Sequence, residues 1–155
     1  MSLLFPELDR QATLDRVAHF FKYDLDQLLL MSGKNLTDIS SPSLSKAPGG
    51  SPIGNSMEQK LIRGVNAEAM INAVIDTINH CPHNSQVILM ERFIKRKSWV
   101  QVQSIMYSSH YKFSYLRRRA MYDFANSFDY WQRVHKCEPI LDLHVYLEEE
   151  LVEGF

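Results

Sequence analysis

Glycine and proline are distributed so unevenly that they decide which class of fold this chain can adopt. Residues 65–153 contain no glycine and only two prolines, Pro82 and Pro139, whereas seven of the chain's glycines and prolines lie between Gly33 and Gly54. A strand-rich domain of that length needs turn glycines, so helices joined by short turns are favoured. Hydrophobic residues make up 45% of the chain, and no apolar run approaches the ~20 residues of a membrane span. We therefore expect an all-α globular protein with no membrane partner.

The Ser-, Pro- and Gly-rich stretch divides the chain into parts. We assign residues 33–56 to a linker on composition. Before it, hydrophobic spacing predicts one or two short helices over about residues 10–32, capped by Asp9 or Thr13, within an N-terminal helical segment 1–32. That segment is too small to hold a core alone, so it should pack on the rest of the chain or on a second copy. A helical domain over 57–136 and an acidic tail over 137–155 complete the division.

Helical spacing continues after the linker. A helix is predicted from Ser56 to about Asn79, with Gly64 or Asn66 as points where it breaks. Pro82 stops the chain, and Asn84 or Ser85 is predicted to cap the next helix. Further on, spacing with Phe124 and Phe128 favours Tyr130 and Trp131 as core residues. The apolar residues of the tail alternate imperfectly and fit either a strand or a short helix; they are Ile140, Leu141, Leu143, Val145 and Leu147.

Two adjacent helices joined by a tight turn are predicted between Ser98 and Phe124. Ser98 followed by Gln101 fits a capping box, and Trp99, Val102 and Met106 then fall on one helical face. A three-residue break at 107–109 follows, and Ser108 or Ser109 caps the second helix. Its apolar stripe is Phe113, Leu116, Ala120 and Phe124, and we place Arg117 and Arg118 with His110, Tyr111, Lys112, Ser114 and Tyr115 on the opposite face. This is the pattern of a helix-turn-helix.

Charge points to a polyanionic partner for this pair of helices. Residues 92–122 carry eight basic side chains and no acidic one, whereas residues 137–155 carry six acidic side chains and no basic one. A helix of this kind fits the major groove of B-DNA. Its first turns reach the edges of the nucleobases, and Arg and Lys side chains further along neutralise phosphates. We expect His110, Tyr111, Lys112, Ser114, Tyr115 and Arg118 in or near the groove of double-stranded DNA. The expected phosphate contacts are Arg92, Lys95, Arg96, Lys97, Arg117 and Arg119.

Residues 85–124 resemble the DNA-binding helices of the fourth region of bacterial sigma factors. The resemblance rests on an aliphatic helix ending in Arg92-Phe93, a short helix capped by Ser98, and a recognition helix with the core Leu116-Arg117-Arg118-Arg119-Ala120. Where sigma-like motifs usually have glycine in the turn, this chain has Tyr107. A residue other than glycine is strained at positive φ, so the turn is expected to be built differently.

The whole chain is similar to the ArpU/RinA group of phage-encoded transcriptional regulators. Shared features are the opening Leu4–Asp9, a leading helix ending in His19-Phe20-Phe21-Lys22, the Ser/Pro-rich linker, the sigma-like segment and the stretch 124–128. The resemblance implies a sequence-specific regulator, an activator of phage late genes or host lysis genes, in the cytoplasm of a bacterial host.

Other functions remain open at this point. One alternative is a DNA-packaging component like the small subunit of a terminase, and another is a sigma-like factor that binds RNA polymerase. A homo-oligomer is a further candidate, and a ring of subunits would favour the packaging component. The clusters His80-Cys81 with His83 and His135 with Cys137 lack the spacing of a zinc site, so we expect no metal and no cofactor. No nucleophile–base pair or phosphate-loop motif occurs, and we expect no enzyme activity.

Overall fold

The computed structural model describes residues 3–35, 61–62 and 65–147, and all structural statements here concern that part of the chain. It is mostly helical, as expected for an all-α protein. None of its helices is both long enough and apolar enough to cross a membrane. In chain order the elements are α1 (Arg10–His19), the π-helical turn η1 (Phe20–Asp24), α2 (Leu25–Ser32), β1 (Leu61–Ile62), β2 (Val65–Asn66), α5 (Ala67–Asn79), α6 (His83–Leu89), the π-helical turn η3 (Met90–Ile94), α7 (Trp99–Met106) and α8 (His110–Val134).

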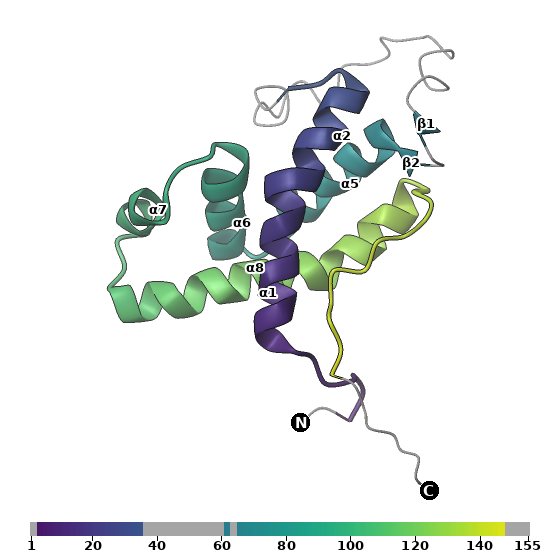
Figure 1. The fold of residues 1–155 in the computed structure, drawn as a ribbon. Helices are drawn as coiled ribbons and strands as arrows, with labels where there is room; N and C mark the ends of the chain where they lie inside the picture. Colours follow the sequence, from purple (N-terminus) through teal and green to yellow (C-terminus); the bar gives the residue numbers. More distant parts are fainter. Residues whose placement is uncertain (1–2, 36–60, 63–64, 148–155) are drawn as a thin grey trace, which may run out of the picture.

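The N-terminal helices form one rod that runs across α8 (Figure 1). Asp9 caps the rod, since its carboxylate accepts a hydrogen bond from the Ala12 amide at 3.0 Å, and Thr13 lies inside the helix. The rod ends at Gly33, whose φ of 79° is the left-handed conformation that glycine adopts without strain. The predicted helices over residues 10–32 are therefore confirmed, with Asp9 as the cap.

Aromatic rings from this rod fill the centre of the core. Phe20 and Phe21 are both buried on η1. The ring of Phe21 stacks on Phe93 at 4.3 Å between centroids and lies 4.7 Å from Phe124, and Phe20 lies 5.3 Å from Phe128. Stacked and tilted rings at these distances are favourable beyond the area they bury. The N-terminal segment thus packs on the same chain.

One predicted helix start is wrong, and another predicted helix breaks at one of its two expected points. The helix expected from Ser56 to about Asn79 is interrupted at Asn66, and α5 begins at Ala67, because Asn66 caps it by accepting a hydrogen bond from the Ala69 amide at 3.1 Å. Just before it, β1 and β2 pair antiparallel, and Ser56 and most of the predicted linker lie outside the described residues. The following helix begins at His83, directly after Pro82 and without a side-chain cap. Ser85 lies inside it, where its hydroxyl donates to Asp123 at 2.6 Å.

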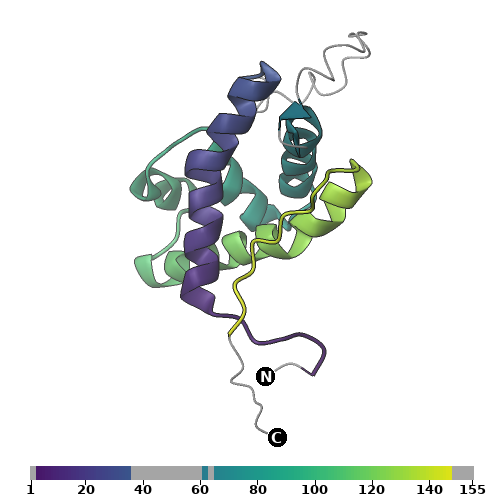
Figure 2. The same ribbon diagram turned by 45° about the vertical axis from the view of Figure 1, so that its right-hand side comes forward.

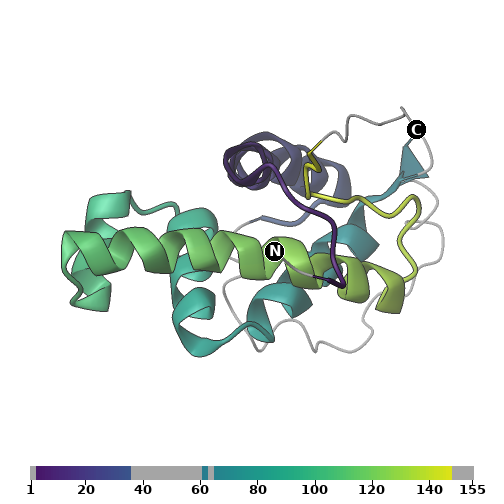
Figure 3. The ribbon, with the colours of Figure 1, turned by 90° about the horizontal axis from the view of Figure 1, so that it is seen from below.

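Helix α8 spans the molecule and packs against α1, α5, α6 and α7 (Figures 1, 2 and 3), and all but one of its buried residues lie in its second half, from Ala120 onward. Phe124 and Phe128 are buried there, as predicted. Tyr130 was predicted to be in the core, but it is 60% exposed. Trp131 is half-buried and stacks on His80 at 4.3 Å. The apolar stripe shifts around α8 toward its end, so adjacent aromatic residues cannot both face inward.

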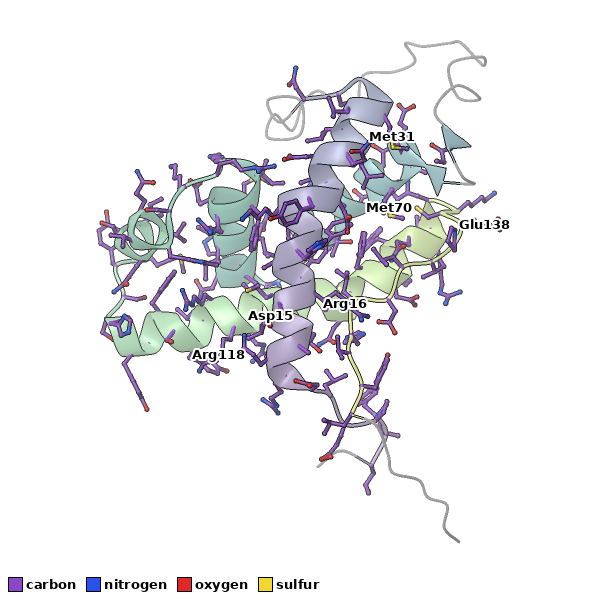
Figure 4. All side chains as sticks on the ribbon, viewed as in Figure 1. Asp15, Arg16, Met31, Met70, Arg118 and Glu138 are labelled. Carbon is purple, nitrogen blue, oxygen red and sulfur yellow. The ribbon has the colours of Figure 1, made fainter. Side chains whose placement is uncertain are left out.

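The described part of the tail, residues 137–147, docks on the helices without forming a regular helix or strand. Leu143 is buried, and the carboxamide of Gln132 makes two 2.8 Å hydrogen bonds with the backbone of Leu141. At the far end, the guanidinium of Arg16, labelled in Figure 4, donates to the carbonyl of His144 at 3.1 Å. Glu148, Glu149, Glu150 and Glu153 lie outside the described residues.

Candidate nucleic-acid interface

The capping box predicted before α7 is present. The Ser98 hydroxyl accepts a hydrogen bond from the Gln101 amide at 3.1 Å, and the Gln101 carboxamide oxygen accepts from the Ser98 amide at 2.9 Å. Two backbone groups that the helix leaves unpaired are thereby satisfied by one local motif. Helix α7 then starts at Trp99, the residue that the sequence predicts.

The turn after α7 is built without glycine. Tyr107 adopts the left-handed conformation, with φ 53° and ψ 41°, and its side chain is 95% exposed. The carboxamide of Gln103 donates to the carbonyl of Ser108 at 3.1 Å, and the Ser108 hydroxyl donates to the carbonyl of Met106 at 3.3 Å. These bonds hold a conformation that is disfavoured for tyrosine. Ser109 rather than Ser108 caps α8, by accepting from the Lys112 amide at 3.2 Å.

Trp99 packs between α7 and α8, and its ring also contacts two positively charged side chains. Its ring meets Phe93 and Phe113 edge-on, at 5.9 and 6.1 Å between centroids. The guanidinium carbons of Arg92 and Arg117 lie 4.7 and 4.9 Å from the centroid of the same ring. Cation–π contacts of this kind are strengthened when the cation loses water. The indole therefore holds two arginines at the junction of the helices.

Two of the predicted phosphate contacts, Arg92 and Arg117, therefore pack within the fold against Trp99. Arg117 was placed on the outer face of α8, but it is half-buried against Trp99, because its position lies near the buried Phe113 and Phe124 around the helix. Arg92 is also half-buried, and it donates to the carbonyl of Lys97 at 2.9 Å. Burial lowers the pKa of Arg92, and the positive charges of Arg117 and Arg96 lower it further. Both arginines stabilise this corner before any partner binds.

The loop between η3 and α7 contains three basic side chains, Lys95, Arg96 and Lys97, and each of them already forms an ion pair with an acidic side chain. The carboxylate of Glu91 forms ion pairs with Lys95 at 3.0 Å and with Lys97 at 2.7 Å. Arg96 forms an ion pair with Asp26 of α2 at 2.6 Å. Burial raises the pKa of Glu91, but the hydrogen bonds from Lys97 and Lys95 outweigh it and leave the pKa below its ordinary value. The acid-free window in the sequence begins one residue after Glu91, which is why sequence reasoning missed this partner.

The outer face of the first turns of α8 remains accessible. His110, Tyr111, Lys112, Tyr115, Arg118 and Arg119 are exposed, and Ser114 is half-buried. Tyr111 is 88% exposed, and within the described residues no hydrogen bond or ion pair engages the side chains of His110, Tyr111 or Lys112. Figure 4 shows Arg118 on the side of α8 that faces away from α6.

Internal contacts orient the remaining side chains on this face. Arg118 donates to the Ser114 hydroxyl at 3.1 Å. Arg119 donates to the Tyr115 hydroxyl at 3.1 Å and to the Asp123 carboxylate at 3.2 Å. Because these pairs lie one helical turn apart, they hold long side chains along the helix axis. The result is a surface of tyrosine rings and positive charge with no acid before Asp123.

Both cysteines are buried, and several histidines form hydrogen bonds within the fold. Burial, and secondly the negative charge of Asp123, raise the pKa of Cys81 to about 12, and burial raises that of Cys137 to about 11. His135 lies 2.6 Å from the Asp76 carboxylate. Over the described ranges, no three His, Cys, Asp or Glu side chains gather as a metal ion would require.

The chain was also compared with known proteins. No family model, no curated protein and no solved structure matches it.

Proposed function

We propose that this protein is a sequence-specific, DNA-binding transcriptional regulator whose α8 enters the major groove. The observation that carries the proposal is the outer face of α8, where Tyr111 and Lys112 are exposed without internal partners on the first turn after the Ser109 cap. No acidic side chain follows on α8 before Asp123. A B-DNA major groove is about 12 Å wide and admits one helix.

The surroundings of α8 support a DNA-bound arrangement. Helix α7 and the first turns of α8 form one end of the molecule, and residues 137–147 run along α1 and the second half of α8 instead (Figures 1 and 2). The described tail therefore leaves the outer face of the first turns of α8 uncovered. We call this surface the reading face; it is formed by His110, Tyr111, Lys112, Ser114, Tyr115, Arg118 and Arg119. Arg119 and the loop with Lys95, Arg96 and Lys97 are the proposed phosphate contacts, and the latter three exchange carboxylates for phosphates on binding.

The biological setting of the proposal comes from the resemblance to the ArpU/RinA group. On that basis the protein acts in the cytoplasm of a bacterial host, as an activator of phage late genes or host lysis genes. It is expected to work without a cofactor and without catalysing a reaction.

The decisive experiment is a pull-down of genomic fragments by the full chain, followed by sequencing of the bound DNA. We expect a small set of enriched sites. On the enriched site, Lys112→Ala should lose affinity, whereas Lys22→Ala, which removes an exposed lysine on η1, should not. Uniform recovery of all fragments, or equal effects of the two substitutions, contradicts reading by α8.

A second candidate, contact with RNA polymerase, is favoured by the outer face of α7. Val100 is 77% exposed there, and Ile105 is also exposed. An apolar face beside a DNA-reading helix suits a protein partner at a promoter. Capture of RNA polymerase by the chain in the absence of DNA, lost in Val100→Ser but kept in Lys112→Ala, supports this contact.

A further inference from the structure

The reading face of α8 has an unusually restricted chemistry. Residues 107–119 contain no Asp, Glu, Asn or Gln. The first carboxylate on the helix, Asp123, is held by Ser85 at 2.6 Å and by Arg119 at 3.2 Å. On α7, Gln101 is engaged in the capping box, and the amide nitrogen of Gln103 is bonded to Ser108. Carboxylate and carboxamide acceptors are therefore lacking from the reading face itself.

The hydroxyl groups on this face are also partly engaged. Ser114 accepts from Arg118 and Tyr115 accepts from Arg119, each at 3.1 Å. What the face offers to a ligand is then chiefly the cationic donors Lys112 and Arg118 and the rings of Tyr111 and Tyr115. The imidazole of His110 and the hydroxyl of Tyr111 are further side-chain polar groups of this face without an internal hydrogen bond to any described residue. The Tyr115 ring is oriented by its bond to Arg119, whereas that of Tyr111 is held by no hydrogen bond.

Each base pair presents different groups in the major groove. Guanine offers two acceptors, O6 and N7, and thymine offers one acceptor, O4, beside its methyl group, whereas adenine pairs its N7 acceptor with an amino group and cytosine offers an amino group alone. Amino groups are best read by the carboxamide of Asn or Gln or by a carboxylate, which this face lacks. Cationic donors and aromatic rings match guanine and thymine.

Resting on the proposed function, we infer that α8 selects its DNA site by guanine acceptors and thymine methyl groups. Lys112 and Arg118 donate to O6 and N7 of guanines. The rings of Tyr111 and Tyr115 pack on the C5 methyl groups of thymines. A protein that reads in this way prefers sites in which the contacted bases, on either strand, are guanine and thymine.

Base analogues test this inference directly. The probe is a duplex selected by the full chain from a random 20-base-pair library, remade with uracil in place of thymine or with 7-deazaguanine in place of guanine. Uracil lacks only the methyl group, and we expect affinity to fall about fourfold for each contacted thymine. The deaza analogue lacks N7, and we expect a loss of about fivefold or more for each guanine that is read.

Matched variants assign the methyl contact to a residue. Tyr111→Ala should bind the thymine and uracil duplexes more nearly alike, whereas Tyr111→Phe, which keeps the ring, should retain the difference. Tyr130→Ala is the control, because Tyr130 is an exposed tyrosine on the opposite end of the same helix. Since Tyr111 is exposed, all three variants are expected to fold, and their thermal unfolding is measured alongside.

The outcomes separate the inference from the function on which it rests. Equal binding of the thymine and uracil duplexes by the unmodified chain overturns the role of the tyrosines, and equal binding of the guanine and deazaguanine duplexes overturns that of Lys112 and Arg118. Loss of discrimination in Tyr111→Phe overturns ring packing. If the library yields no preferred duplex at all, the proposed function itself fails.

Discussion

The first half of α8, His110–Arg119, differs from the second half, Ala120–Val134, in how its side chains are used. In the first half only Phe113 is buried, and most polar side chains face solvent. In the second half six residues are buried under α1, α5, α6 and the tail: Ala120, Met121, Phe124, Ala125, Phe128 and Gln132. One continuous helix thus joins an open surface to the centre of the core.

This contrast teaches that the residues that stabilise the fold and the residues that we propose to bind DNA lie in separate halves of a single helix. A helix projecting a polar face into solvent is marginal on its own, because most helical stability in proteins comes from packing. Here the packed second half fixes the direction of the whole helix, and the capped first half follows it. Substitutions in the two halves should therefore affect different measurements.

The largest effect is expected from the second half. Phe124→Ala should lower the free energy of unfolding by about 3–5 kcal/mol, because it leaves a cavity among Phe20, Phe21 and Phe128. Urea denaturation followed by circular dichroism measures the change. Tyr130→Ala, on the exposed side of the same half, should stay within about 0.5 kcal/mol. Similar losses in both variants would mean that the buried side of this half is assigned wrongly.

Truncation after Lys136 tests whether the tail belongs to the packed half. It removes Leu143, whose burial alone contributes about 1.5–3 kcal/mol, and the hydrogen bonds to Thr13 and Arg16. We expect a lower melting temperature together with unchanged preference among DNA sites. If instead the truncated chain keeps its stability and binds random DNA more tightly at low salt only, the acidic tail competes with DNA.

Arginines at the two ends of α8 give the cleanest test of the open half. Arg118 and Arg133 are both exposed, and each bonds a side chain one turn earlier, Ser114 and Asp129 respectively. Arg118→Ala should weaken binding to the preferred site by about 1–3 kcal/mol with stability almost unchanged. Arg133→Ala should affect neither measurement by more than about 0.5 kcal/mol. Equal binding losses from the two ends would remove the distinction between the halves.

The smallest effect concerns the ion pair between Arg96 and Asp26. Arg96→Ala should remove one phosphate contact and flatten the dependence of log affinity on log salt by about 0.9. Stability should fall by less than about 1 kcal/mol, because an exposed pair contributes little. Titration with fluorescent DNA at several salt concentrations gives the slope. An unchanged slope would show that Arg96 keeps away from DNA.

Local signals in the sequence predicted the parts of the fold that local interactions determine. The cap of α7 depends on two residues three positions apart, Ser98 and Gln101, and was predicted correctly. The same holds for the stripe of Phe113, Ala120 and Phe124, with Leu116 half-buried at its edge. Motifs that satisfy their own hydrogen bonds are readable without the tertiary structure.

The errors arose where distant residues decide. Arg117 turns inward because Trp99, on another helix, offers it a ring, and Arg96 is engaged by Asp26, seventy positions earlier. Helical periodicity predicts which face of a helix is apolar, but it does not predict contacts with residues on other elements. The exposure of individual basic side chains was therefore the least predictable property of the candidate site.

The antiparallel bridge between Leu8 and Tyr146 bears on when this protein can fold. The Thr13 hydroxyl accepts from the Val145 amide at 3.0 Å, across a separation of 132 residues. At about 5–20 residues per second of synthesis, the ribosome needs about 7–26 s to travel that distance. Throughout that interval Thr13 and Arg16 on α1 lack the hydrogen-bond partners that the tail supplies. The fold can therefore be completed only near the end of synthesis, and the N-terminal helices are accessible to chaperones until then.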